Sequence, residues 1–121
     1  MKPTELSDRL LEFAARAAKV AESLPDGRSG RHVAGQLVRC CTSPAVNYEE
    51  ACGAESRRDF THKLAICLKE VRETRGWLRL IAKTELMQAD RLRELIDESE
   101  QLSRILGKSI ATAKGVAKRP D

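Results

Sequence analysis

The sequence predicts an all-α fold, an antiparallel up-down-up-down four-helix bundle. Apolar residues recur at alternating steps of three and four in four long segments, which is the seam of a helix packed in a bundle. Helix-favouring Leu, Ala, Glu, Arg and Lys dominate the composition, while aromatic residues make up only 3%. Short loops between long helices favour antiparallel neighbours. A chain of 121 residues is about one domain long, and we expect this domain to span residues 1–114 before a flexible tail at 115–121.

The first helix is predicted by an uninterrupted seam that ends at the loop PDGRSG, residues 25–30, because Pro and two Gly continue a helix poorly. A second helix should run from Arg31 to Ala51. Pro44 lies inside it and removes one backbone hydrogen bond, so we expect a kink between Cys40 and Pro44. The predicted inward residues are Leu6, Leu10, Phe13, Ala17, Val20 and Leu24 in the first helix, and Val33, Leu37, Cys40, Cys41 and Val46 in the second.

Two more helices are predicted after Gly53 breaks the chain. Ser56 is a good N-cap for a third helix at 57–83, and Asp59 places a negative charge near the positive end of its dipole. The fourth helix is predicted at 90–114. The expected inward residues are Phe60, Leu64, Cys67, Val71, Thr74, Leu78 and Ile81 in the third helix, and Leu92, Leu95, Ser99, Leu102, Leu106 and Ala113 in the fourth.

The chain is moderately basic, with a net charge of +4 and a pI of about 9.0. The basic excess lies in residues 56–83, which carry 8 positive against 3 negative charges. On a helical wheel these cations share an arc beside the core seam, and such a face is typical of proteins that bind nucleic acid. A solvated face that keeps the protein soluble is the alternative interpretation. The candidate nucleic-acid-binding residues are Arg58, Lys69, Arg72, Arg75, Arg79 and Lys83.

Three apolar residues lie on the other flank of the predicted third helix, among its acidic residues: Ile66, Trp77 and Leu80. A single bundle does not need apolar side chains there, so we expect another subunit to bury them. The alternative is that Trp77 lies flat on its own bundle, since large aromatic side chains bury much area wherever they sit. We favour oligomerisation.

Catalysis has little support in the sequence. Arg57 and His62 stand in the R-x4-H arrangement that marks a ribonuclease site in some helical proteins. Five residues on a helix place them about 140° apart, so an ordinary helix start is the favoured interpretation. Asp59 and His62 could form half of a carboxylate-bridged metal site, but the second pair that such a site needs is absent. We therefore predict no enzyme activity, no metal and no cofactor.

The sequence also indicates where the protein resides. No segment approaches the roughly 18 uninterrupted apolar residues of a membrane span, and the N-terminus has no apolar signal core. We expect a cytoplasmic protein without a membrane partner. Its cysteines lack the spacing of a zinc site and should be reduced and mostly buried: Cys40, Cys41, Cys52 and Cys67.

Two stretches carry a family resemblance, QLVRCCTSPAVNYEEA at 36–51 and SRRDFTHKLAICLKEVRETRGWLRL at 56–80. They resemble the four-helix-bundle family named for a protein encoded in intervening sequences of bacterial 23S ribosomal RNA genes. The second stretch is similar to a subgroup with S-R-x-x-F-x-H-K-L and K-E-x-x-E-T-x-x-W-L. In the first, Ala51 departs from the Gly that many members have. The family pattern Q-L-x-R-x-x-x-S-x-x-x-N-x-x-E is met by Gln36, Leu37, Arg39, Ser43, Asn47 and Glu50.

The resemblance implies architecture more than activity. Members form ring-like homopentamers, and a related branch, the accessory protein of diversity-generating retroelements, presents a basic surface to nucleic acid and to a reverse transcriptase. The expected partners are therefore further copies of the chain, RNA or DNA, and a protein such as a reverse transcriptase. A structural scaffold that docks a protein partner is the alternative function. We expect structural roles for Gln36 and Arg39, and expect Asn47 and Glu50 to tie the second helix to a neighbour by buried hydrogen bonds.

Overall fold

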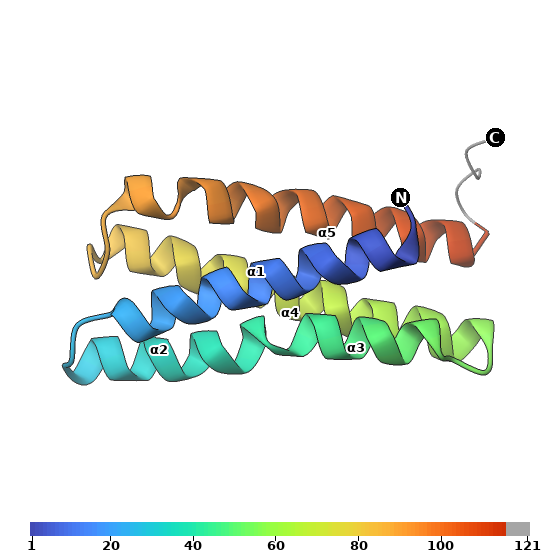
Figure 1. Cartoon of the computed structure of the whole chain (residues 1–121), viewed down its shortest axis with the longest axis horizontal. Helices are drawn as coiled ribbons and strands as arrows, with labels where there is room; N and C mark the ends of the chain where they lie inside the picture. Colours follow the sequence, from blue (N-terminus) through green and yellow to red (C-terminus); the bar gives the residue numbers. More distant parts are fainter. Residues whose placement is uncertain (116–121) are drawn as a thin grey trace.

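The computed structural model describes residues 1–115, and these form four helical rods that lie side by side (Figure 1). One rod consists of two helices in succession, α2 and α3. The described residues contain no strand, so the all-α prediction is confirmed; the predicted tail lies outside the described residues except for Gly115. The elements are α1 (Pro3–Ser23), α2 (Arg28–Cys41), α3 (Ser43–Cys52), α4 (Arg57–Lys83), the short 3-10 helix η1 (Ala89–Arg91) and α5 (Arg93–Ala113).

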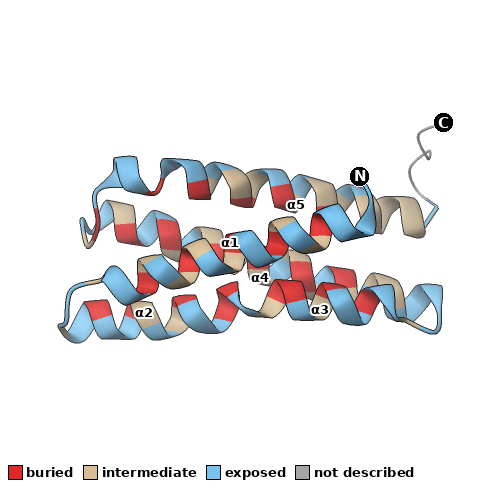
Figure 2. Ribbon diagram, viewed as in Figure 1, coloured by how far each residue is buried: buried red, intermediate tan, exposed pale blue. Residues whose placement is uncertain are grey.

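The core lies along the common axis of the four rods, and the buried residues of each rod face it (Figure 2). The chain reverses direction after α1, after α3 and after α4 (Figure 1). α4 packs against α2, α3 and α5, and α1 closes the other side. Burying one large aliphatic side chain contributes about 1.5–3 kcal/mol, so this seam is the main source of stability. The seam residues that are fully buried include Leu10, Phe13, Leu37, Leu64, Val71, Leu78, Leu102 and Leu106.

The turn between α1 and α2 is shorter than predicted. α2 begins at Arg28, inside the expected loop at 25–30, and Gly30 lies buried in its first turn. A Cβ atom on Gly30 would lie 1.9 Å from the carbonyl oxygen of Pro25, far inside contact distance. The helix can therefore begin early because Gly30 has no side chain between it and the turn.

The expected kink in the second rod is a break at Thr42, between α2 and α3. Pro44 lacks the N–H that would bond the Cys40 carbonyl in a continuous helix. The Thr42 backbone N–H and hydroxyl both donate to the Val38 carbonyl, at 3.3 and 2.8 Å. The break leaves the helical phase nearly unchanged, because the inward positions continue at steps of three and four through Leu37, Cys40, Pro44, Tyr48 and Ala51. The prediction that Val46 points inward is wrong: Val46 is nine residues after Leu37, about 180° from it on the helical wheel, and it is 60% exposed.

The third and fourth rods largely follow the predicted seams. Ser56 caps α4, and its hydroxyl oxygen accepts a hydrogen bond from the Asp59 backbone N–H at 3.0 Å. α4 ends in a turn in which Glu85 adopts φ 60°, and the Leu86 N–H donates to the Ile81 carbonyl at 3.1 Å. The helix that was predicted to begin at residue 90 starts as η1 and becomes α-helical at Arg93. The predicted inward residues that are only half-buried are Val20, Leu24, Phe60 and Ala113.

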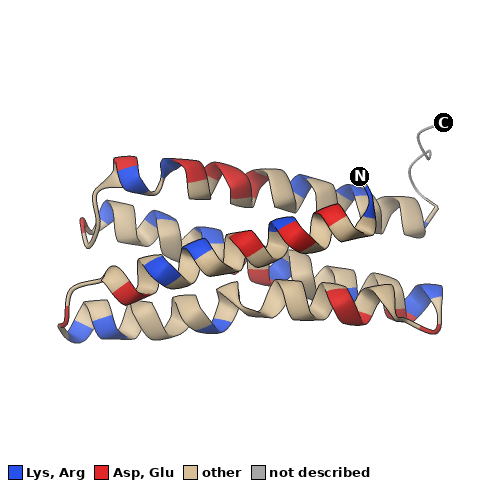
Figure 3. Ribbon diagram, viewed as in Figure 1, with Lys and Arg blue, Asp and Glu red and all other residues tan. Residues whose placement is uncertain are grey.

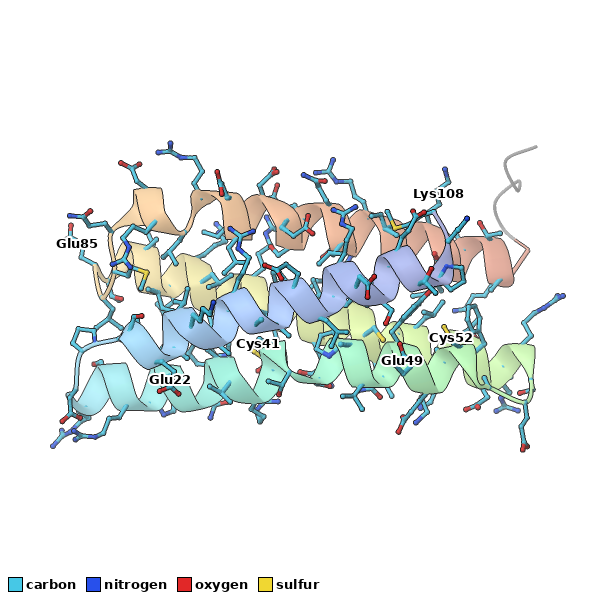
Figure 4. The ribbon with its side chains drawn as sticks, viewed as in Figure 1. Glu22, Cys41, Glu49, Cys52, Glu85 and Lys108 are labelled. Carbon is cyan, nitrogen blue, oxygen red and sulfur yellow. The ribbon has the colours of Figure 1, made fainter. Side chains whose placement is uncertain are left out.

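The cysteines behave mainly as small apolar side chains. Cys40, Cys41 and Cys67 are buried, whereas Cys52 is exposed on α3, beside the first turns of α1 (Figure 4). Burial removes the water that stabilises a thiolate, and this raises the pKa of Cys41 to about 11 and that of Cys67 to about 12. It also raises the pKa of Cys40. These three thiols are therefore protonated at neutral pH and poor nucleophiles.

Replacing Gly30 by Ala should destabilise the protein by about 1–3 kcal/mol, because the added Cβ overlaps the Pro25 carbonyl. Gly35→Ala in the same helix is the matched control, since a Cβ there meets no atom within 4 Å. Ala is favoured over Gly inside a helix by about 1 kcal/mol, so the control should stabilise. Urea unfolding followed by circular dichroism measures both, and stabilisation by both substitutions would contradict the close approach at Gly30.

In the native protein, one thiol should react rapidly with an aromatic disulfide reagent at pH 8, and three should react only on unfolding. The reactive group is Cys52, because the other three are buried and protonated. Absorbance of the released thiolate counts the reacting groups with time, and Cys52→Ser should abolish the fast phase. A second fast thiol would show that the bundle opens more readily than its packing indicates.

Candidate nucleic-acid interface

The predicted cations lie along one side of α4, which has 27 residues and is about 40 Å long at 1.5 Å per residue. Five of the six are exposed, and Arg75 is half-buried. Their spacing of three, four and seven residues from Lys69 onward keeps them on one face, while Arg58 stands about 16 Å away near the N-terminus of the helix. The exposed five are Arg58, Lys69, Arg72, Arg79 and Lys83.

These five exposed cations form no ion pair with any residue of the described range 1–115. The sixth does: Nη2 of Arg75 lies 3.2 Å from Oε1 of Glu100 on α5. Other cations in the bundle are held in the same way. Arg9 binds Glu98 at 2.5 Å, and this hydrogen bond raises the pKa of Arg9. The positive charge on α4 is thus mostly left free for an external anion.

α5 extends this basic face in a way that the single-helix pattern did not reveal. A shallow hollow lies between α4 and α5, and Lys108 at its edge projects from α5 away from the bundle (Figure 4). Arg104 and Lys108 are four residues apart and therefore neighbours on α5, which was the available sequence signal. Recognising it requires knowing which part of α5 lies beside Arg72. The hollow is lined by Arg72, Arg75, Glu100, Ser103, Arg104, Gly107 and Lys108.

Charge is unevenly distributed along α5. Acidic residues gather in its first half and basic residues in its second half (Figure 3). The first half carries Glu94, Asp97, Glu98 and Glu100, of which Glu94 pairs with Arg16, Glu98 with Arg9 and Glu100 with Arg75. α5 follows α4 through a short turn, so its acidic half lies nearer the Lys83 end of α4. The positive field is consequently strongest around the hollow rather than uniform along α4.

The candidate interface residues Ile66, Trp77 and Leu80 differ in exposure. Trp77 packs partly against the core, its ring lies edge-on to the exposed ring of His32 at 6.0 Å, and its Nε1–H donates to Glu73 at 3.3 Å. Leu80 is 41% exposed, and Ile66 is half-buried but outside the core cluster. Trp77 thus belongs partly to its own bundle, whereas Leu80 still offers apolar surface.

The residues of the Q-L-x-R motif link α2 to α4. Nη2 of Arg39 on α2 donates to Oε1 of Gln36 in the same helix at 3.3 Å. Arg39 also forms ion pairs with Glu73 and, at 3.7 Å, with Glu70 of α4. Oε2 of Glu70 is buried and has no hydrogen-bond partner within the described chain, so the charge of Arg39 is what compensates it. The structural role expected for Gln36 and Arg39 is consistent with these contacts.

The expectation for Asn47 and Glu50 needs correction. Nδ2 of Asn47 donates within α3, to the carbonyl and hydroxyl oxygens of Ser43 at 3.1 and 2.9 Å, so it does not reach a neighbouring helix. Glu50 does reach α4, where it accepts from Nζ of Lys63 at 2.8 Å, but it is an exposed ion pair rather than a buried bond. The bond raises the pKa of Lys63. The reason for the Asn47 contact is local, because Ser43 is four residues earlier and lies on the same side of α3.

Other kinds of site find little support in the described residues. Arg57 and His62 are both exposed near the start of α4, and neither side chain forms a hydrogen bond within residues 1–115. No group of three His, Cys, Asp or Glu side chains in this range is arranged to hold a metal ion. No helix in the same range has the length and apolar character needed to cross a membrane.

Comparison with known proteins agrees with this architecture. The chain is similar to a crystal structure of a protein of unknown function from the S23 ribosomal protein family of Bacteroides thetaiotaomicron VPI-5482. The two share 33% sequence identity and a TM-score of 0.81, over 87% of this chain and 97% of that one. No curated protein matched. A family model described as 23S rRNA-intervening sequence protein matches residues 4–108. The chain therefore belongs to the 23S rRNA-intervening sequence protein family.

Proposed function

We propose that the protein is a non-enzymatic homo-oligomer that binds nucleic acid through the basic face of α4. The observation that supports this function is the row of five exposed α4 cations with no acidic partner in residues 1–115. Lys and Arg side chains that neutralise phosphates release condensed counterions, so such a face favours binding that weakens as salt rises. The contacts would position the backbone and would not read base sequence.

The assembly that we propose is the ring of five bundles that the family resemblance implies. Ile66, Trp77 and Leu80 are the proposed contacts between subunits. The support is that Leu80 is 41% exposed and that Ile66 lies outside the core cluster of its own bundle. Several copies of the basic face in one particle would raise the apparent affinity for a long polyanion by multivalency.

Reversing two charges on the basic face of α4, Arg72→Glu with Arg79→Glu, should abolish most salt-dependent binding of nucleic acid. Fluorescence anisotropy of a labelled RNA across a salt series measures it, and the slope of log K against log salt should become shallower by about 1.4–1.8, at roughly 0.7–0.9 for each of two lost phosphate contacts. Lys19→Glu with Arg28→Glu is the control, because it changes the net charge equally at exposed positions on α1 and α2.

Two results would redirect the proposal. Equal isotherms for the stripe variant and the control would remove the α4 face from the function, and no binding by the wild type would favour a scaffold that docks a protein partner, such as a reverse transcriptase. The ribonuclease alternative is tested by whether the labelled RNA is still intact after incubation with the protein. Cleavage that disappears in His62→Ala would support catalysis by Arg57 and His62.

Leu80→Glu should lower the native mass of the assembly, because it places a charge in the proposed subunit contact while leaving the core seam intact. Trp77→Glu should act in the same direction, with an added loss of stability because Trp77 also packs on its own core. Native mass spectrometry or light scattering measures the mass, and Leu11→Glu, at a 55% exposed position on α1, is the control. An unchanged mass in both variants would place the interface elsewhere.

A further inference from the structure

The hollow between α4 and α5 has features of a phosphate-binding site that neither helix possesses alone. Arg72 and Arg75 approach it from α4, and Arg104 and Lys108 from α5. We infer that this hollow receives the phosphodiester backbone of a nucleic-acid duplex, and that Arg104 and Lys108 are binding residues. The inference rests on the proposed function and deepens it, since it names the centre of the site and the form of its ligand.

Charge supports an anionic occupant. The lining contains four cations and one carboxylate, that of Glu100, and Arg75 already pairs with this carboxylate at 3.2 Å. Neighbouring helix axes in a bundle lie about 8–10 Å apart, so cations from both helices can contact one phosphate from two directions. The Nε–H of Arg104 lies 3.4 Å from the Glu100 carbonyl oxygen of its own helix, and the residue remains exposed.

The floor of the hollow is formed by small residues. Gly107 has no side chain, and even a Cβ there would meet no atom within 4 Å. The Ser103 hydroxyl donates to the Ser99 carbonyl at 2.8 Å, so this short side chain lies against its own helix and does not fill the hollow. A phosphate group can therefore come close to the α5 backbone between Arg104 and Lys108, where larger residues would hold it off.

The absence of aromatic residues from this lining points to a duplex. Proteins that bind single strands commonly stack the unpaired bases on exposed aromatic rings. In this chain Phe13 and Tyr48 are buried, and Trp77 lies on the opposite flank of α4. Phe60 is half-buried and lines, with Tyr48, a second hollow bordered by α1 and α5, which shares only Lys108 with the basic hollow. The basic hollow offers charge without stacking, which suits a backbone whose bases are already paired.

The position along α4 adds a length argument. From Arg58 to Lys83 the helix rises about 38 Å, close to one helical turn of a duplex at roughly 34–36 Å. The hollow lies between these ends, beside Arg72 and Arg75. Arg58 and Lys83 lie about 21 and 16 Å from Arg72 along α4, less than one duplex turn. With one strand's backbone in the hollow, the cations at the two ends would therefore contact the complementary strand.

Binding of fluorescent 20-base-pair DNA and RNA duplexes, and of their separate strands, by the full chain tests the inference. Arg104→Glu with Lys108→Glu should weaken duplex binding at least tenfold in 0.1 M salt, and should make the salt slope shallower by about two. Arg104→Gln with Lys108→Gln should give a smaller loss. The control is again Lys19→Glu with Arg28→Glu, and circular dichroism verifies that each variant is folded.

The outcomes separate the inference from the function on which it rests. Duplex binding that exceeds single-strand binding and depends on Arg104 and Lys108 supports the inference, and the DNA and RNA arms then identify the backbone preferred. If Arg104→Glu with Lys108→Glu binds the duplex as tightly as the wild type does, or if the wild type binds single strands more tightly than the duplex, the inference is overturned. The proposed function of the α4 face then still stands. Wild-type protein that binds neither form overturns the proposed function as well.

Discussion

The rest of the structure depends on the buried seam of α4. This helix packs against α2, α3 and α5, and its fully buried residues occupy one arc of its surface. The remaining surface is thereby divided into two flanks. The flank beside α2 carries Glu70 and Glu73, which pair with Arg39, whereas the flank beside α5 carries the cations. Fixing the seam therefore fixes which charges are used inside the bundle and which remain at its surface.

Much of the fold could be predicted from the sequence because a helical seam is a local pattern. Leu6, Leu10, Phe13 and Ala17 repeat with the period of a helix, and no distant residue is needed to interpret them. The extent of the interruption could not be predicted, because Pro44 indicates only a kink, whereas the helix breaks at Thr42. Val46 and Asn47 differ from expectation for local reasons: Val46 lies about 180° from Leu37 on the helical wheel, and Asn47 bonds to Ser43 one turn before it.

The candidate site also has one part that the sequence predicts and one part that only the packing of the helices reveals. The α4 stripe could be recognised from the sequence because one helix carries it, and helical spacing alone places its members on one face. The contribution of α5 depends on the alignment of two helices, which only packing determines. Arg104 comes to lie beside Arg72 and Arg75 because Leu95, Leu102 and Leu106 set the position of α5 in the core. Packing also removes one unpaired cation from the basic face of α4, since Arg75 is paired with Glu100.

The break at Thr42 has a consequence for the cooperativity of the bundle. α3 contains 10 residues, fewer than the 12–15 or so that an isolated helix needs to persist in water, and it no longer shares a continuous hydrogen-bond ladder with α2. Its order depends on side-chain burial and on contacts such as the Cys67 thiol with the Pro44 carbonyl, at 3.3 Å. α3 is thus the segment best able to open as a separate unit while the three long rods keep their seam. Such an opening would expose the Cys67 side of α4 to solvent and leave the basic face on the other flank undisturbed.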